Sequence, residues 1–397
     1  MYMTKLSSIA DYVTDKISSN DIALREYVTT DCILQNKKGR EIATNLPPQS
    51  CCLTRYQRGD VLIANIRPYL KKVWFADIDG GASSDVLVFR AKEGHSPSFL
   101  YAVLLQDSFF DYVMQGAKGS KMPRGDKEQI LRYEMPTLSC SEESIGTFFL
   151  NLDKKIRLNE QINQNLEAMA KQLYDYWFVQ FDYPDENGKP YKSSGGKMVW
   201  NEKLKREIPE GWKDITLNAF IDKNKGGDWG YDTPKDGTIK VGCVRGADII
   251  KLNDVPTRHI TSKHSDRLLE DGDIVIEISG GSPVQATGRV ALITKGVIER
   301  NEGALVCSNF CQSFSMKKRT YSEYFYYLWR NLYDNDNMFN FEGKTSGIKN
   351  FQTDVFLANH WFEAQEQLIE KFHVIVSQYH LMIDQNISKN NILIKQR

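Results

Sequence analysis

Residues 59–63 read Gly-Asp-Val-Leu-Ile, and residues 272–276 read Gly-Asp-Ile-Val-Ile. A Gly-Asp pair before an apolar run is typical of a turn that leads into a strand, so this match alone has little weight. Three further pairs of segments match in the same order along the chain: 6–11 with 217–222, 116–121 with 343–349, and 145–148 with 369–372. The shared order predicts two similar modules, with loop insertions between the matching segments.

A chain with two similar modules approaches two-fold symmetry by itself, and such symmetry suits a ligand with two related halves. Duplex DNA is the leading candidate. With 397 residues, the chain has room for two domains that each bury a core. Lys plus Arg and Asp plus Glu both number 51, so net charge argues neither for nor against a nucleic acid. Because a DNA-binding protein usually has a basic surface, that surface must here be local or shared with a partner.

The composition also excludes several classes of protein. No apolar stretch approaches the length of a membrane span, and the first residues contain no sustained apolar run, so we expect a cytoplasmic protein with no membrane partner. The seven cysteines are scattered without a Cys-x-x-Cys pair. This spacing favours reduced thiols over a disulfide framework or a zinc site.

Strand-like and helix-like patterns alternate along the chain in an order that predicts two mixed α/β domains and two long helices. The first domain contains one expected helix, 97–114, and the second contains an aromatic helix, 321–333. A segment rich in Pro, Gly, Ser and charge is interpreted as a linker. The expected parts are a first domain at 1–141, a long helix at 142–181, the linker at 182–213, a second domain at 214–361 and a closing helix at 362–397.

Both long helices have apolar residues at alternating steps of four and three, which is the spacing of a coiled-coil seam. The expected seam of the first helix contains Phe149, Leu152, Ile156, Asn159, Asn163, Leu166 and Leu173. That of the closing helix contains Leu368, Phe372, Ile375, Tyr379 and Met382. The pattern allows either direction of pairing, and an antiparallel pair would place the two domains at opposite ends of a rod.

Two asparagines in the middle of the first seam leave its rotation open. A buried polar residue costs stability and tends to fix the register of a helix pair, so Asn159 and Asn163 could specify the pairing. Alternatively the helix is rotated, and Leu158, Ile162 and Met169 occupy the seam at this level.

The middle of the chain strongly resembles the central region of the specificity subunit of type I restriction-modification systems. The resemblance depends on about 60 residues, which include Leu-Asp-Lys-Lys-Ile-Arg-Leu-Asn-Glu-Gln-Ile-Asn at 152–163, Leu-Glu-Ala-Met-Ala at 166–170, Trp-Phe-Val-Gln-Phe-Asp at 177–182, Asn-Gly-Lys-Pro-Tyr-Lys-Ser-Ser-Gly-Gly at 187–196 and Glu-Ile-Pro-Glu-Gly-Trp at 207–212. The layout of two domains and two helices extends it over the whole chain.

The resemblance implies an α+β protein in which two similar mixed α/β target recognition domains are separated by a long two-helix antiparallel coiled coil. Each domain would read one half of a bipartite, asymmetric site in double-stranded DNA. The coil would also dock two adenine methyltransferase subunits that use S-adenosylmethionine. Endonuclease and translocase subunits that use ATP and Mg would join them. The chain itself would contain no catalytic residue and bind no cofactor or metal.

Candidate DNA-binding residues lie in two kinds of segment. Two segments rich in Gly, Lys and Ser or Thr suit a phosphate backbone and contain Lys118, Ser120, Lys121 and Arg124 in the first half, and Lys344, Thr345, Ser346, Lys349 and Asn350 in the second. The segments that follow the Gly-Asp strands contain Arg67, Tyr69, Lys71 and Lys72 in the first half, and Ser279, Ser282 and Gln285 in the second. Arg67 suits paired hydrogen bonds to guanine and Gln285 to adenine. Solvated loops without a ligand would have a similar composition.

Motifs of catalysis do not stand out in the sequence. We find no methyltransferase loop with an Asn/Asp-Pro-Pro-aromatic motif and no carboxylate-x-Lys spacing typical of a nuclease. His373 and His380 lie seven residues apart, which a helix face explains better than a metal site. Two other hypotheses remain open: an enzyme that acts alone, and a coiled-coil scaffold whose domains bind proteins without reading DNA sequence.

Overall fold

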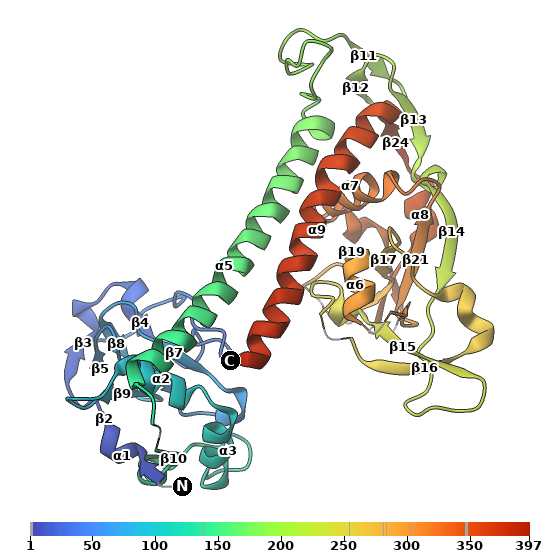
Figure 1. Cartoon of the computed structure of the whole chain (residues 1–397). Coiled ribbons are helices and arrows are strands. Elements are labelled where there is room, and N and C mark those ends of the chain that lie inside the picture. The colour runs from blue at the N-terminus through green and yellow to red at the C-terminus, as the bar shows by residue number, and fades with distance from the viewer. Residues whose placement is uncertain are drawn as a thin grey trace. The chain divides into compact units, whose positions relative to one another are not determined.

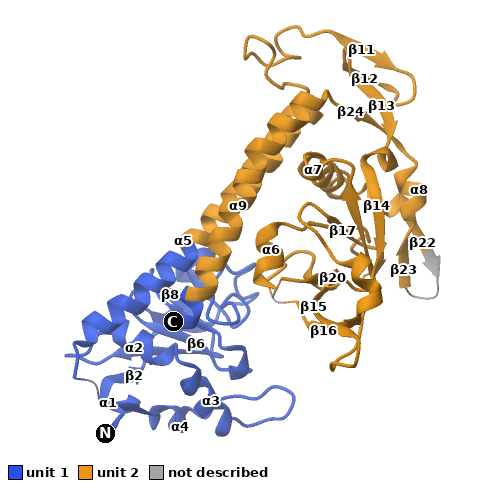
Figure 2. Ribbon diagram, turned by 45° about the vertical axis from the view of Figure 1, so that its right-hand side comes forward, with its two compact units in different colours: residues 1–157, 393–397 blue, residues 158–392 orange. Residues whose placement is uncertain are grey.

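The structure is a computed structural model that describes residues 3–137, 139–253, 255–280, 282, 284–301, 303–345 and 348–397. It divides into two compact units (Figure 2): unit 1 comprises 1–157 and 393–397, and unit 2 comprises 158–392. The boundary falls inside the long helix α5 (Glu142–Tyr174), so each unit contains part of it. Within the described part of the chain, no helix is both long enough and apolar enough to cross a membrane.

The described residues of unit 1 form two four-stranded sheets with short helices (Figure 1). The first sheet has the order β2-β9-β6-β7, and all of its neighbouring strands are antiparallel. Its strands are β2 (Ala10–Tyr12), β6 (Val61–Ala64), β7 (Val73–Phe75) and β9 (Val86–Ala91). The second sheet, of order β3-β5-β8-β4, contains β3 (Lys16–Ser18), β4 (Tyr27–Val28), β5 (Cys52–Tyr56) and β8 (Gly80–Ala82). The short helices are α1 (Leu6–Ile9), α2 (Pro97–Leu104), α3 (Asp107–Gln115) and α4 (Lys127–Leu131).

Unit 2 repeats this arrangement. Its antiparallel sheet has the order β14-β21-β17-β19 and contains β14 (Ile221–Gly226), β17 (Ile274–Glu277), β19 (Val290–Leu292) and β21 (Cys311–Met316). A second sheet, β16-β15-β20, contains β15 (Thr238–Val244), β16 (Thr257–Thr261) and β20 (Leu305–Cys307). Strands β15 and β20 run parallel, as β4 and β8 do in unit 1. The helices are α6 (Lys295–Arg300), α7 (Tyr321–Asp334), α8 (Thr353–Leu357) and α9 (Glu366–Gln396).

A short antiparallel strand pair accompanies each module. In unit 1, β1 (Met3–Lys5) pairs with β10 (Glu134–Pro136), and in unit 2, β13 (Lys213–Thr216) pairs with β24 (His360–Glu363). In both units the first strand of this pair leads through one helical turn into the first strand of the main sheet. The main antiparallel sheet and the short strand pair therefore have the same strand order and direction in both units, whereas the second sheets differ in strand number.

The Gly-Asp turns that reveal the repeat have the same hydrogen bonds in both units. Gly59 and Gly272 adopt φ values of 95° and 94°, in the left-handed region that favours glycine. The carboxylate of Asp60 accepts the Gln57 amide at 2.9 Å, and that of Asp273 accepts the Glu270 amide at 2.8 Å. Each carboxylate is buried and also binds one cation of its own sheet: Arg90 and Lys225, respectively.

Each Gly-Asp turn leads into a strand that is buried on both faces. Val61 and Ile63 of β6 pack with the helices α2 and α3, whereas Leu62 packs with the second sheet. The same alternation occurs in β17, where Ile274 and Ile276 belong to one buried cluster and Val275 belongs to another. Such two-sided burial explains the unbroken apolar runs in the sequence.

Helices α5 and α9 lie side by side in unit 2 (Figures 1 and 2). The side-chain amide of Asn159 donates to Asn390 at 2.7 Å, and that of Asn386 donates to Asn163 at 2.9 Å. The partner numbers on α9 fall as those on α5 rise, so the helices run antiparallel. Asn159 is only 2% exposed.

The remaining expected seam residues differ in their burial. Leu152, Ile156, Leu166, Leu368 and Phe372 are buried. Phe149 is half-buried against the core of unit 1, and Leu173, Ile375 and Tyr379 are half-buried against the core of unit 2. The alternative seam residues Leu158 and Met169 are about half exposed, at 53% and 47%.

Met382 does not lie in the seam of α9, because its side chain is 47% exposed. The neighbouring buried residues are His380 and Asp384. The globular part of unit 2 fixes the rotation of α9 at this level: Arg300 of α6 binds Asp384 at 2.7 Å, and Tyr327 of α7 contacts His380. A strict heptad count places Met382 inward because it ignores this packing.

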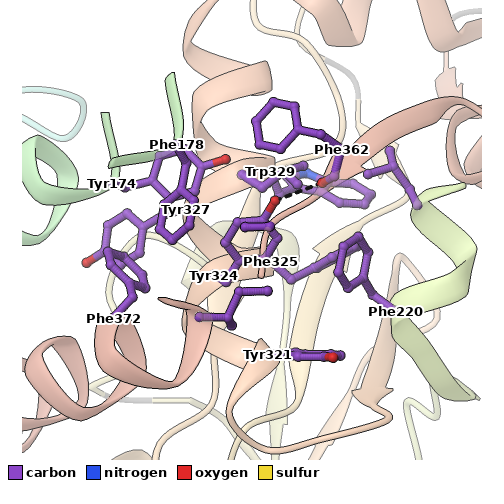
Figure 3. Close-up of a cluster of buried hydrophobic side chains, with 14 of the residues drawn as sticks. Tyr174, Phe178, Phe220, Tyr321, Tyr324, Phe325, Tyr327, Trp329, Phe362 and Phe372 are labelled. Carbon is purple, nitrogen blue, oxygen red and sulfur yellow. Dashed lines mark hydrogen bonds between the residues drawn. The ribbon is translucent and has the colours of Figure 1, made fainter. Parts of the chain in front are cut away.

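A cluster of aromatic side chains joins α7 to both long helices within unit 2 (Figure 3). The Phe178 ring lies 4.8 Å from Tyr324 of α7 and 5.2 Å from Phe372 of α9, measured between centroids. The Tyr324 hydroxyl donates to the carbonyl of Phe362 at 3.0 Å. Large buried aromatic surfaces contribute much of the stability of such a core, so the end of α5 is well anchored.

Four segments differ from the sequence-based expectations. The helix expected at 97–114 is two helices, α2 and α3. The segment 182–213 contains a hairpin, β11 (Met198–Asn201) with β12 (Arg206–Pro209), and the stacked rings of Tyr183, Tyr191 and Trp212. The α-helical part of α5 ends at Tyr174, before a π-helical turn at Asp175–Val179, and α9 begins at Glu366 because His360–Glu363 form β24.

Replacement of Asn159 by leucine should destabilise the helix pair by about 1–3 kcal/mol, because the Asn390 carboxamide would then face an apolar side chain. The double variant N159L/N390L should recover part of this loss, since both polar groups are removed together. Urea unfolding followed by circular dichroism at 222 nm measures both effects. The matched control is Asn165→Leu on the exposed face of α5, and an equal effect of the two single substitutions would contradict the prediction.

Candidate nucleic-acid interface

The loop after β6 displays a cation and an aromatic ring at the surface of unit 1. Arg67 and Lys71 flank a short 3₁₀ helix, Pro68–Leu70, and both adopt left-handed backbone conformations. The turn is closed by the Leu70 amide, which donates to the Arg67 carbonyl at 2.9 Å. The side chains of Arg67 and Tyr69 are accessible at this surface, and Tyr69 is 49% exposed.

The segment 116–124 lies directly beside this loop. The Arg67 amide donates to the carbonyl of Pro123 at 2.8 Å, and the Gly125 amide donates to that of Asn65 at 3.3 Å. Lys118 and Arg124 exchange two backbone hydrogen bonds of 2.9 Å, so the segment folds back on itself. The fold therefore brings together two groups of candidate residues that are about 50 positions apart in the sequence.

Several of these cations pair with carboxylates of unit 1. Lys71 binds Asp107 at 2.7 Å, Lys118 binds Asp126 at 3.0 Å and Arg124 binds Asp85 at 3.1 Å. Lys72 donates to the Thr30 carbonyl. Within the described residues, Arg67, Ser120 and Lys121 make no side-chain hydrogen bond or ion pair. Exposed ion pairs contribute little to stability, so Lys118 and Arg124 can exchange their partners for phosphates at small cost.

Asp107 and Asp126 are held in their charged forms. Hydrogen bonds from Lys37 and Lys71 lower the pKa of Asp107. The pKa of Asp126 is lowered by the backbone amide of Gln129, which it caps at the start of α4, and by Lys118. Both carboxylates therefore orient the neighbouring lysines at neutral pH.

A third segment of this surface was not predicted from the sequence. The amides of Asn36 and Lys37 donate to the carbonyls of Leu70 and Lys71, both at 2.9 Å. Lys37 also binds Asp107 at 2.7 Å. The run Gln-Asn-Lys-Lys-Gly at 35–39 is polar, basic and closed by glycine, and this composition is the signal that could have identified it.

Unit 2 assembles the corresponding segments into a small sheet. The loop after β17 contains β18 (Ser279–Gly280), which pairs with β23 (Ile348–Phe351), and β23 pairs with β22 (Glu342–Thr345). The Ser279 hydroxyl donates to Asn350 at 2.6 Å. Ser346 and the side chains of Lys344 and Thr345 lie outside the described residues.

A buried carboxylate organises this small sheet. Glu342 accepts the Thr287 amide at 2.8 Å and binds Lys349 at 3.0 Å. Burial alone would raise the pKa of Glu342, but these bonds outweigh burial and lower it. Gln285 is exposed, and its amide donates to the Ser282 hydroxyl at 3.1 Å.

The two surfaces differ in chemistry although they occupy equivalent places in the repeat. Unit 1 presents arginine and lysine around Tyr69, whereas unit 2 presents the small polar groups of Ser279, Ser282 and Gln285. Cations suit phosphates and guanine, and amide or hydroxyl groups suit other base edges. The arrangement can therefore bind two chemically different targets on one scaffold.

The cysteines and the histidines of α9 were also considered in the sequence as possible metal ligands. The seven cysteines are free, and no group of three potential metal ligands is found in the described part of the chain. His373 binds Glu323 at 2.7 Å, and His380 is buried beside Tyr327. Burial lowers the pKa of His380.

No family model matches the chain. Its sequence is 24% identical over 214 residues to the type I restriction enzyme MjaIX specificity subunit of Methanocaldococcus jannaschii, a match that covers 53% of the chain. It is 28% identical over 190 residues to the type I restriction enzyme HindI specificity subunit of Haemophilus influenzae, across 45% of the chain. These matches cover 45% and 40% of the two relatives. They confirm the resemblance to specificity subunits.

A solved structure supports the fold. The crystal structure of the S subunit of a type I restriction-modification system from M. genitalium matches the whole chain and 94% of its own length, with a TM-score of 0.59 and 14% identity. The chain thus has the fold of that S subunit.

Alanine at Gly125 should loosen the junction of the loops in unit 1. A Cβ there would lie 2.8 Å from Asn65 Oδ1 and from a methyl group of Val113, so we expect a loss of about 1–3 kcal/mol in unfolding free energy. Thermal and urea unfolding measure it. The matched control is Gly226→Ala, whose Cβ would meet nothing within 4 Å, and equal stabilities of the two variants would contradict this prediction.

Proposed function

We propose that the chain is the DNA-specificity subunit of a type I restriction-modification complex and reads a bipartite, asymmetric site. The chain is related in sequence to two specificity subunits and has the fold of a third. In this proposal, catalysis belongs to partner subunits, and this chain supplies recognition.

The observation that carries the proposal is the repeated placement of the candidate loops. In both units, the loop after the Gly-Asp strand contacts a segment rich in Gly and Lys: 66–72 contacts 116–125 in unit 1, and 278–289 contacts 342–351 in unit 2. A rigid sheet with exposed loops is well suited to sequence reading, because the scaffold positions side chains without restricting their identity. We therefore assign one target recognition domain to each half-site.

The different chemistry of the two loops supports an asymmetric site. Arg67 suits guanine and Gln285 suits adenine, each through two parallel hydrogen bonds worth about 1–3 kcal/mol of discrimination. The lysines and the glycine-rich backbone suit phosphates, which fix the position of the protein on the duplex. We therefore assign base reading to the loops after β6 and β17, and phosphate binding to the second segments.

We assign α5 and α9 the role of a spacer that sets the unspecified gap between the half-sites. A helix rises about 1.5 Å per residue, so the 33 residues of α5 correspond to about 50 Å. The polar pairs of Asn159 and Asn163 favour this role, because polar contacts between helices, of which that of Asn159 is buried, restrict the helices to one register.

The partners in this proposal are two adenine methyltransferase subunits that bind S-adenosylmethionine, and endonuclease and translocase subunits that use ATP and Mg. Adenine methylation requires a base flipped out of the duplex into a pocket, which the methyltransferase would supply. Exposed apolar side chains on the helices, among them Leu158, Met169, Leu381 and Met382, suit the docking of such partners.

The decisive experiment is the methylome of cells that express the chain with its methyltransferase. A two-part adenine-methylated motif with a fixed gap is expected. Exchange of residues 1–141 for another recognition domain should change one half of that motif only, because each unit contains its own reading loops. Changes in both halves would contradict modular reading, and the absence of any motif would favour a protein-binding scaffold.

Insertion of one heptad into both α5 and α9 should lengthen the gap by about three base pairs, since seven residues add about 10 Å and the seam register is kept. The gap is read from the same methylome. Insertion into α5 alone is the control and should abolish methylation, because the Asn pairs lose their alignment. An unchanged gap in the double insertion would exclude a spacer role.

A further inference from the structure

Left-handed backbone conformations cluster at the surface loops of unit 1. Among the described residues, seven that are not glycine have positive φ, and four of these lie here: Asn36, Lys37, Arg67 and Lys71, at 56°, 61°, 53° and 50°. Each such residue is less stable than in a right-handed or extended conformation, because its Cβ lies close to the following carbonyl oxygen. Strained residues of this kind persist only where the surrounding structure holds them, and they gather at functional sites.

The loops hold one another through backbone and side-chain bonds. The amides of Asn36 and Lys37 bind the carbonyls of Leu70 and Lys71, and the side chains of Lys37 and Lys71 share the carboxylate of Asp107. Two lysines on one carboxylate leave a net positive charge at this point. The side chains of Gln35 and Lys38 extend that charge and polarity outward.

Arg397 holds the other side of the 36–37 loop. Its guanidinium donates to the carbonyls of Lys37 at 3.1 Å and Asn36 at 3.5 Å, and it binds Asp153 of α5 at 2.7 Å. Tyr101 donates its hydroxyl to the same carboxylate. The side chains of Arg397 and Asp153 are only 7% and 4% exposed, so this is a buried, fully bonded ion pair.

Desolvation of the two charges offsets much of the attraction in a buried ion pair, so such a pair adds little net stability. Its directional hydrogen bonds nevertheless fix the positions of the groups that they join. The fork of Arg397 matches the two successive carbonyls of a left-handed turn. These hydrogen bonds stabilise the left-handed backbone conformations of Asn36 and Lys37. Through the bonds to Leu70 and Lys71, the same restraint reaches the loop of Arg67.

We propose that residues 35–38 form a third DNA-contacting segment of unit 1, with Lys38 on the phosphate backbone and Arg397 as the positioning residue that holds the segment. The inference rests on the proposed function. Segments 35–38, 67–72 and 118–124 are connected by hydrogen bonds into one surface whose cations outnumber their carboxylate partners. A duplex is the ligand that this charge and continuity favour, because it offers phosphates at regular intervals along its length.

The first test measures DNA binding by the full chain in complex with its methyltransferase. The probe is a synthetic duplex that carries the bipartite motif found in the methylome. Lys38→Ala should reduce the slope of log affinity against log salt by about 0.9, which corresponds to one lost phosphate contact. Lys16→Ala, at an exposed cation of β3, is the matched control and should leave the slope unchanged. Equal slopes for wild type and Lys38→Ala would overturn the assignment of this segment.

The second test examines Arg397 by hydrogen exchange of the purified chain, without DNA. Arg397→Ala should accelerate exchange in segments 33–40 and 66–72, but not in β9. Arg397→Lys preserves the charge beside Asp153, but its single nitrogen lacks the two separate guanidinium nitrogens that reach the carbonyls of Lys37 and Asn36. Exchange in 33–40 should therefore be accelerated in this variant as well. Unchanged exchange in that segment for Arg397→Lys would overturn the positioning role.

The same variants separate this inference from the proposed function. In the methylome, Arg397→Lys should relax base discrimination in the half of the motif that responds to exchange of residues 1–141, and leave the other half intact. A core variant such as Ile9→Val, which only lowers stability, should leave discrimination unchanged in both halves. If the wild-type complex shows no sequence preference at all, the proposed function itself is refuted. If the wild-type complex reads its motif and the Lys38 and Arg397 variants bind and discriminate DNA as the wild type does, only the role of the third segment is refuted.

Discussion

A buried aspartate at the start of a two-sided strand is the constraint on which both modules depend. Asp60 and Asp273 each follow a left-handed glycine, accept a backbone amide of their own turn and bind one cation of their sheet. A buried carboxylate without such partners would be strongly unfavourable, so the turn, the cation and the strand must form together. The turn therefore fixes where β6 and β17 begin, and with them the loops that follow.

The pair of long helices requires a second constraint, on register and rotation, because helices with apolar stripes can slide or rotate against one another. The pairs Asn159–Asn390, which is buried, and Asn163–Asn386, which is half-buried, restrict the register, since any shift would break both hydrogen bonds. Aromatic packing around Phe178 and Phe372 then fixes the end of α5 against α9 and α7 within unit 2. Polar pairs restrict the register in this arrangement, and aromatic burial stabilises it.

In the function that we propose, separation of scaffold and reading loops lets one repeated fold serve two different half-sites. The four-stranded antiparallel sheet keeps the same strand order in both units, whereas its following loop contains Arg67 and Lys71 in unit 1 and Ser279 and Gln285 in unit 2. Substitutions in exposed loops cost little stability, because few buried contacts depend on them. Recognition can therefore change while Gly-Asp turns and central strands stay the same.

Local patterns in the sequence determined the repeat, the two long helices, the buried central strands and the identity of the candidate loops, because turns and periodicity depend on neighbouring residues. Tertiary structure alone decided which side of α9 faces inward at His380 and Met382, and that the Pro- and Gly-rich segment folds around Trp212. It also placed residues 35–38 beside the loop of Arg67 and within hydrogen-bond distance of the Arg397 guanidinium. Contacts between residues so distant along the chain depend on how whole elements pack, and no pattern among neighbours encodes them.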